Sequence, residues 1–321
     1  MRKKSTEEVT IFRKFLRISK KIVRCFLEKT MNVIIFLSEA SRIRFELKCY
    51  INRRFDDYCL RHDYSGLISK IFNGKMTHLD VGASAGPVDI VQKYSSFFNV
   101  ILCEPAKEEA ELLRKEGYKV IEKALSDKVG EITLFETRLP YGSSVYKPQG
   151  PYLDFYNPDP DYVSLYDTIR ETVVPCSTIS KELSHLKIPE IDFLKLDTQG
   201  SELNILRGLG DYQPLMIMTE IEYLPLYHGQ PNAYDVCQYL FKLGYIPFAL
   251  TSSPAPTFCP VYGDGYFMPS WTESEGIELI QSREEKYIAL MLMFGQGKVL
   301  KFVNNKIKLK NKKFIESLNV N

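Results

Sequence analysis

The chain has 321 residues, of which 45% are hydrophobic and 26% are charged, an ordinary composition for a globular protein. Its formal net charge of +2 is too small for a global field that attracts nucleic acid or membrane. Seven scattered cysteines without a CxxC pair argue against a zinc site and against a disulfide framework. No apolar run approaches the roughly 18 residues that span a bilayer. We therefore expect a cytoplasmic protein with one large domain and no nucleic-acid partner.

Residues 8 to about 60 show helical periodicity, with Ile11, Phe15 and Ile18 at spacings of three and four. Lysines and arginines occupy the other faces of this segment. Two interpretations remain open. The helix packs on protein, either the main domain or a second subunit of a homo-oligomer, or it lies on anionic lipid as a peripheral membrane contact. We predict a helical extension over 1–70.

From about residue 76, short apolar runs alternate with helical segments, which is typical of a parallel sheet with crossover helices. The predicted strands span 77–82, 99–104, 118–121, 191–197 and 215–220, and the predicted helices span 87–96, 106–116, 201–208 and 232–243. Residues 138–170 are rich in Pro, Tyr, Gly and Asp and are interpreted as a long loop. The pattern predicts an α/β domain over 71–272, followed by a C-terminal helix and a basic tail over 273–321.

The most informative local pattern follows the first predicted strand. It reads Asp80-Val81-Gly82-Ala83-Ser84-Ala85-Gly86-Pro87, so that an acid ends the strand and two glycines frame a tight turn. Gly82 and Gly86 let the backbone approach a ligand closely. Pro87 suits the first position of a helix, whose free amides and positive dipole end would face that ligand. Open α/β sheets bind nucleotides at this place.

Glu104 ends the second predicted strand, 24 residues after Asp80 (104 − 80), and its carboxylate can accept two hydrogen bonds from a ribose diol. Asp80 can hold the amino end of a methionine moiety, and Ser126 follows the third strand, where an adenine edge would lie. A dinucleotide oxidoreductase is the competing interpretation. The turn is GxxxG rather than GxGxxG, with Pro87 where a third glycine is expected, which argues against it. The predicted cofactor-binding residues are Asp80, Gly82, Ala83, Gly86, Glu104, Pro105, Ser126 and Asp197.

A second pattern lies downstream. It consists of Val173-Val174-Pro175-Cys176-Ser177-Thr178-Ile179, then Ile191-Asp192-Phe193-Leu194-Lys195-Leu196-Asp197-Thr198-Gln199-Gly200-Ser201-Glu202, then Leu206-Arg207-Gly208. With Asp80-Val81-Gly82, Glu104 and Glu220, it resembles the pattern of the FkbM methyltransferase family over roughly residues 76 to 250. In that family a "DLLKIDVEGAE…VLKG" segment follows a valine-rich strand, so Gln199 and Ser201 are departures.

The resemblance implies a doubly wound, mostly parallel seven-stranded sheet of the Rossmann-like, class I methyltransferase type. It also implies S-adenosylmethionine as cofactor and O-methylation of a sugar or polyketide-type hydroxyl, so the expected partner is a small-molecule or glycan acceptor. The departure at Gln199 removes a carboxylate from that position, while Asp197 and Glu202 match the family pattern. A non-catalytic binding module of the same fold is the alternative, and the intact Asp80, Gly82 and Glu104 argue against it.

Three residues are predicted to carry catalysis, namely Asp197, Glu222 and His228. Asp197 ends the fourth strand, at the edge where ligands bind. Glu220 and Glu222 end the fifth strand, and we expect them on opposite faces, so that only one points toward the cleft. His228 can remove the proton of an acceptor hydroxyl, or it is a surface loop residue. No His-rich cluster indicates a metal, so none is assigned.

The acceptor is expected between three segments that follow strand ends, namely 138–170, 197–202 and 220–230. Tyrosines in these regions supply aromatic faces and hydroxyls suited to a sugar ring. They are Tyr141, Tyr146, Tyr152, Tyr223 and Tyr227. Packing of the loop is the alternative role for these side chains.

Overall fold

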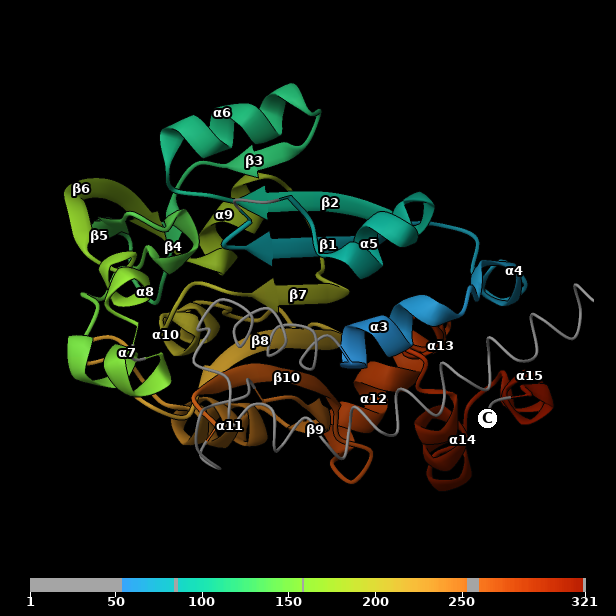
Figure 1. Cartoon of the computed structure of the whole chain (residues 1–321). Coiled ribbons are helices and arrows are strands. Elements are labelled where there is room, and N and C mark those ends of the chain that lie inside the picture. Colours follow the sequence, from blue (N-terminus) through green and yellow to red (C-terminus); the bar gives the residue numbers. More distant parts are fainter. Residues whose placement is uncertain (1–53, 84–85, 158, 253–259, 320–321) are drawn as a thin grey trace, which may run out of the picture. The chain divides into compact units, whose positions relative to one another are not determined.

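The structure is a computed structural model, which describes residues 54–83, 86–157, 159–252 and 260–319 (Figure 1). Most of the predicted basic N-terminal helix lies outside the described residues, so neither of its two interpretations is addressed. Ser84 and Ala85 of the glycine-rich turn lie outside them as well. Cys103, Cys176 and Cys237 are free thiols. Among the described helices, none combines the length and apolar character needed to cross a membrane.

Seven strands form the main sheet, in the order β3-β2-β1-β7-β8-β10-β9. Their bounds are β1 Met76–Val81, β2 Phe98–Cys103, β3 Lys119–Ile121, β7 Phe193–Leu196, β8 Met216–Glu222, β9 Tyr245–Leu250 and β10 Tyr262–Pro269. Strand β1 lies inside the sheet and pairs in parallel with β2 on one side and the central strand β7 on the other. Strand β10 runs antiparallel to both of its neighbours. The predicted doubly wound, mostly parallel, Rossmann-like sheet is confirmed.

Helices cover both faces of this sheet because each buried strand is apolar on both sides. Phe193 and Met216 face a cluster that includes α5 (Asp89–Lys93) and the C-terminal helices. Their neighbours Leu194 and Ile217 face a second cluster on the other side. That second cluster is formed with α9 (Ile179–His185), α10 (Glu202–Arg207) and α11 (Ala233–Lys242). Helix α6 (Lys107–Lys115) connects β2 to the edge strand β3.

The segment 273–321 folds into helices where the sequence analysis predicted one helix and a basic tail. They are α12 Ser274–Ser282, α13 Glu284–Met293, α14 Gly297–Lys306 and α15 Lys312–Ser317. Every residue of α13 from Tyr287 to Met293 is buried, so the helix is apolar around its whole circumference. Each buried Leu, Ile or Met contributes about 1.5–3 kcal/mol relative to an exposed one. The short helices α3 (Arg54–Arg61) and α4 (Ser65–Ile68) precede β1.

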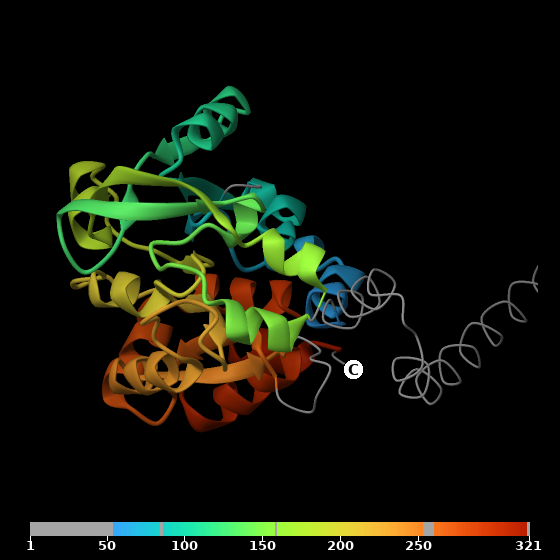
Figure 2. The same cartoon turned by 60° about the vertical axis from the view of Figure 1, so that its left-hand side comes forward.

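A second, three-stranded sheet has the order β4-β6-β5. Its strands are β4 Ala124–Leu125, β5 Gly130–Thr137 and β6 Thr168–Ser177, and Figure 2 shows β5 and β6 side by side. The connection between β5 and β6 includes η2 (Pro140–Gly142), α7 (Gly150–Tyr156) and α8 (Pro160–Ser164). The prediction of a long loop over 138–170 is therefore wrong in part. Asp159 caps α8 by accepting a hydrogen bond from the Asp161 amide, and Pro160 occupies the first helical position.

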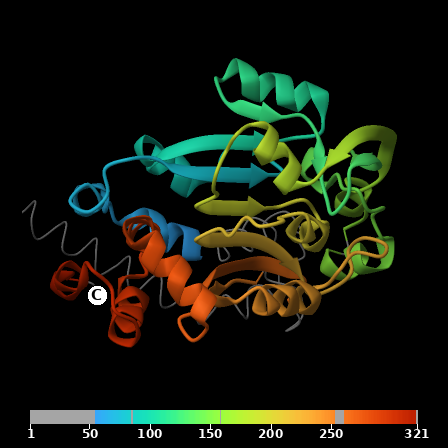
Figure 3. The same ribbon diagram turned by 180° about the vertical axis from the view of Figure 1, so that it is seen from behind.

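The small sheet, α7 and α8 lie beyond the carboxyl ends of the parallel strands (Figure 1), and the view from behind shows the same arrangement (Figure 3). In open α/β sheets this is the edge at which ligands bind. The position of the small sheet therefore turns an open edge into an enclosed one.

Candidate functional site

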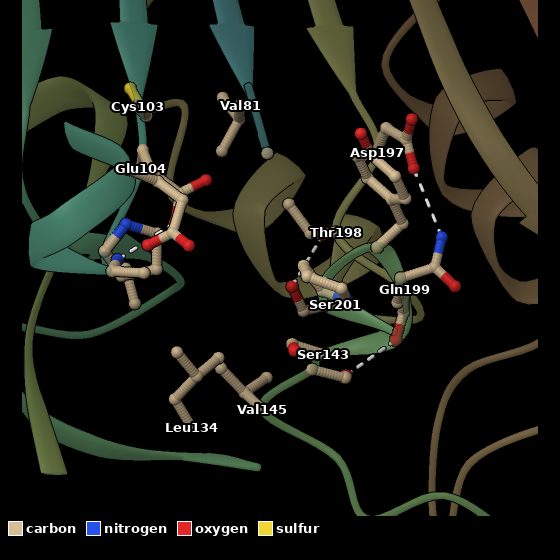
Figure 4. A pocket seen from close by; sticks show the side chains of 18 of the residues that line it. Val81, Cys103, Glu104, Leu134, Ser143, Val145, Asp197, Thr198, Gln199 and Ser201 are labelled. Carbon is tan, nitrogen blue, oxygen red and sulfur yellow. Dashed lines mark hydrogen bonds between the residues drawn. The ribbon is translucent and has the colours of Figure 1, made fainter. Parts of the chain in front are cut away.

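A cavity of about 530 Å³ lies at the carboxyl ends of β1, β2 and β7. Its walls come from the ends of these strands and from the small sheet with the segment that follows β5. Figure 4 shows Glu104 and Asp197 on opposite sides of the cavity, with Leu134 and Val145 on the side of the small sheet. The predicted binding edge is therefore a walled cavity in the structure.

Gly82 forms the turn at the end of β1, where its φ of +82° lies in the left-handed region. A methyl group at this position would stand 1.8 Å from the Asp197 carbonyl oxygen, so only glycine fits beside β7. Gly86 also has a positive φ, +83°, but a methyl group there would have no neighbour within 4 Å. Both glycines line the cavity, so the backbone of the turn is open to a ligand.

Glu104 follows β2 and presents its carboxyl group to the cavity, although only 7% of the residue is exposed. One carboxylate oxygen accepts a hydrogen bond of 2.9 Å from the Ala106 amide. Burial raises the pKa of Glu104 to about 7. Pro105 and Ala106 line the cavity beside it. The structure thus places an acid with a perturbed pKa where the sequence predicted a ribose-binding acid.

Lys195 lines the cavity and was not predicted as a site residue. Its ammonium lies 3.0 Å from Asp80 Oδ1 and 3.4 Å from Asp197 Oδ2, and it donates to the Gly82 carbonyl oxygen at 3.3 Å. A charged residue inside an apolar strand, two positions before Asp197, is the signal that identifies it, because alternate residues share a face.

Asp80 itself does not line the cavity. It is fully buried behind Lys195, with its second oxygen 3.4 Å from His78 Nε2 and accepting from the Val88 amide at 3.3 Å. Burial alone would raise the pKa of Asp80, but Lys195 and His78 together lower it below its ordinary value. Asp80 is therefore an ionised group that holds Lys195 in place.

Gln199 connects the residues on the other side of the cavity. Its amide nitrogen donates to Glu220 Oε2 at 2.6 Å and to Asp197 Oδ1 at 3.3 Å, and its amide oxygen accepts from the Tyr227 hydroxyl at 2.9 Å. Its backbone is in the left-handed region, with a φ of +57°, which is uncommon for a residue other than glycine. The residue that departs from the family pattern therefore bridges two acids with a neutral amide.

Glu220 lines the cavity on the same side and belongs to a cluster of three acids with Glu202 and Glu222. One carboxylate oxygen from each lies within 4.8 Å of the others. The expectation of opposite faces for Glu220 and Glu222 is wrong, because residues two apart in a strand point to the same side. Burial, and then the neighbouring negative charges, raise the pKa of all three.

Several predicted site residues lie away from the cavity surface. His228 is exposed in the segment between β8 and α11, and its backbone amide donates to the Lys147 carbonyl oxygen. Ser126 is buried after β4, where its amide donates to the Ser177 carbonyl oxygen, and Ala83 is buried behind the turn. Glu222 is buried behind the cavity wall rather than lining it. Next to Ser126, the two preceding residues, Ala124 and Leu125, line the cavity in its place.

The five tyrosines predicted around the acceptor have different positions. Tyr141 is exposed and lines the cavity. Tyr227 is fully buried and its hydroxyl lies 3.1 Å from the Gly142 carbonyl oxygen, so it packs the loop. The Tyr146 hydroxyl accepts from Asn204 at 2.8 Å. Tyr152 and Tyr223 do not line the cavity.

The sheet order and the cavity at its carboxyl edge define a Rossmann-like α/β domain with a ligand site at the edge where this fold binds nucleotides. Residues 80–247, which are 168 of 321, match the model of the Methyltransferase FkbM domain. The chain belongs to the FkbM methyltransferase family. No match was found among curated proteins.

Solved structures that resemble the chain include one with bound S-adenosylmethionine and one with bound S-adenosyl-homocysteine. Magnesium protoporphyrin IX methyltransferase from Synechocystis PCC 6803, with bound S-adenosylmethionine, is 9% identical with a TM-score of 0.37, over 78% of this chain and 97% of that chain. TrmK from M. capricolum, in complex with S-adenosyl-homocysteine, is 14% identical with a TM-score of 0.31. The match covers 80% of this chain and 92% of that chain.

Proposed function

We propose that this protein is an S-adenosylmethionine-dependent methyltransferase that methylates a hydroxyl group of a sugar, a glycan or a polyketide-like molecule. Membership of the FkbM family supports the reaction class. The observation that carries the proposal is the cavity at the ends of β1, β2 and β7, with Glu104 on one side and Asp197 on the other. The small net charge favours a small-molecule or glycan acceptor over nucleic acid.

The residues around the cavity fit this cofactor. Glu104 would accept hydrogen bonds from the ribose diol, and the open backbone at Gly82 and Gly86 would lie against the methionine part. Lys195, held by Asp80, would face the carboxylate of that part. Ala83 and Pro105 would act through the backbone next to these residues.

The adenine ring would find apolar surface at Leu134, Val145 and Leu125, which all line the cavity. Ser126 follows Leu125 directly and would support this wall from behind. The sequence interpretation placed the adenine edge at Ser126, and the proposed contact is therefore one residue away from it.

Methyl transfer needs an aligned acceptor and the exclusion of water. When bound, S-adenosylmethionine supplies a methyl group on a positively charged sulfur. Asp197, with 46% of its side chain exposed, is the carboxylate best placed to take the proton of an acceptor hydroxyl. Neither Glu222 nor His228 lines the cavity. Glu222 would therefore influence the acceptor through its neighbour Glu220, and His228 would contact the acceptor only as the acceptor approaches the cavity.

Calorimetry of the full chain with S-adenosylmethionine tests the proposal. We expect binding, and we expect Glu104→Ala to weaken it by about 1.5–3 kcal/mol, or roughly 10- to 150-fold, since hydrogen bonds to a charged group are lost. Glu116→Ala, at an exposed acid after α6, is the matched control and should bind like the wild type. Binding of NAD without affinity for S-adenosylmethionine would contradict the proposal. Tight cofactor binding without methylation of any hydroxyl acceptor would favour the non-catalytic module.

A further inference from the structure

We propose that Glu202, Glu220 and Glu222 form a binding site for a divalent cation with oxygen ligands. The three side chains come from separate parts of the chain, the first residue of α10 and two alternate residues at the end of β8. Their carboxylate oxygens lie within 4.8 Å of one another. Glu202 is only 1% exposed and Glu222 only 2%, so solvent does not screen their mutual repulsion.

An unpartnered oxygen on one of these three side chains is the second observation. Glu222 Oε1 is buried and has no hydrogen-bond partner in the described part of the chain. Leaving a buried carboxylate oxygen without a partner costs several kcal/mol. A cation bound between the three acids would satisfy this oxygen and remove the repulsion at once.

Three other buried acids of the protein have a cationic side chain beside them. Asp80 is paired with Lys195 at 3.0 Å, Asp192 with Lys286 at 3.0 Å, and Glu182 with Lys123 at 2.8 Å. Within residues 54–319, as far as they are described, no ion pair involves any of the three clustered glutamates. The three glutamates of the cluster therefore lie together, and no positively charged side chain is paired with them in these residues.

The donor set selects the kind of ion. Carboxylate oxygens without histidine or cysteine suit Mg²⁺, Mn²⁺ and Ca²⁺. Oxygen ligands about 2.1–2.4 Å from an ion lie at most about 4.2–4.8 Å from one another, and the three carboxylate oxygens of the cluster lie within 4.8 Å of one another.

Two of the three acids are already oriented by neighbours. Glu202 Oε1 accepts from the Thr198 amide at 2.7 Å and from its hydroxyl at 2.8 Å. Glu220 Oε2 accepts from the Gln199 amide group at 2.6 Å. Such outer hydrogen bonds fix metal-binding carboxylates in place, so the cluster is built as a site rather than as a loose group of acids.

The position of the cluster gives the ion a role that rests on the proposed function. Glu220 lines the cavity next to Asp197 and Gln199. Three protein ligands leave other coordination positions free, and those on the Glu220 side face the cavity. A hydroxyl oxygen of the acceptor could occupy one of them, which would orient it beside the bound cofactor.

Titration of the full chain with MnCl₂ after treatment with a chelator tests the site. Free Mn²⁺ is followed by electron paramagnetic resonance, without S-adenosylmethionine present. We expect one tightly bound Mn²⁺ per chain, and a loss of affinity of more than about tenfold in Glu222→Gln. Glu104→Gln, at the opposite side of the same cavity, is the matched control. It should keep its Mn²⁺ affinity and lose affinity for S-adenosylmethionine, whereas Glu222→Gln should do the reverse.

Thermal unfolding separates a lost site from a lost fold. Because Glu222→Gln removes a buried charge, the variant should unfold at a higher temperature than the ion-free wild type. Mn²⁺ should raise the unfolding temperature of the wild type and not that of the variant. The site is refuted if the folded wild type binds no Mn²⁺, or if Glu222→Gln binds it equally well. Cofactor binding without Mn²⁺ binding refutes this inference alone, and Mn²⁺ binding without cofactor binding refutes the proposed function alone.

Discussion

Replacing Gly82 with alanine should destabilise the protein far more than the same change at Gly86. The two glycines have nearly equal φ values, +82° and +83°, so the left-handed conformation costs each alanine about 1–2 kcal/mol. Only at Gly82 does the new methyl group meet an atom, the Asp197 carbonyl oxygen at 1.8 Å. This oxygen belongs to the backbone and cannot rotate away, so the ends of β1 and β7 must separate. Overpacking of this kind adds about 1–3 kcal/mol.

We therefore expect losses of about 2–5 kcal/mol for Gly82→Ala and about 1–2 kcal/mol for Gly86→Ala. Urea unfolding of the ligand-free chain, followed by far-ultraviolet circular dichroism, measures both. Equal m-values would show that the unfolded states are comparable. If the two variants lose the same stability, the close contact between Gly82 and β7 does not constrain the fold, and the reasoning about the turn fails.

Three further predictions concern the cavity. Because burial raises the pKa of Glu104 to about 7, its carboxyl group gains a proton as the pH falls from about 8 to about 6, and affinity for S-adenosylmethionine should drop about tenfold over this interval. Calorimetry across this range measures the drop, which should vanish in Glu104→Gln, and an unchanged slope in that variant would contradict the assignment. Asp197→Asn should lower methyl transfer by at least about 100-fold while cofactor affinity changes little, because a base acts in the transition state; an equal loss of both would make Asp197 a cofactor ligand only. Tyr227→Phe should cost about 1–3 kcal/mol in urea unfolding, since the Gln199 amide oxygen loses its donor, the buried Tyr227 hydroxyl, whereas Tyr234→Phe, at a residue that is 76% exposed, should change nothing.

The sequence by itself determined the five parallel strands of the main sheet and one wall of the site, but not the strands β9 and β10. The apolar runs before Asp80, Glu104 and Asp197 predicted β1, β2 and β7, and the parallel arrangement brings their ends to one edge. The two glycines after β1, Gly82 and Gly86, predicted a tight turn at that position. These features depend on local periodicity and on the residue at the end of each strand, so they can be read without knowing which distant segments meet.

Other features depend on contacts between segments far apart in the chain, and only the tertiary structure decided them. The composition of the segment 138–170 predicted a loop, yet the segment contains α7 and α8, and its ends are fixed by the pairing of β5 with β6. The sequence analysis predicted both His228 and Glu222 as catalytic residues, but His228 is exposed and Glu222 is buried behind the cavity.

The charge pattern of the site was also settled by tertiary contacts. Lys195 neutralises Asp80 across two neighbouring strands, whereas Glu202 comes from a helix to meet Glu220 and Glu222 with no cationic side chain paired to them in the described residues. Sequence periodicity predicts which face of its own strand or helix a side chain occupies. It does not predict which charge from another element will lie opposite, because that depends on how the elements pack in three dimensions.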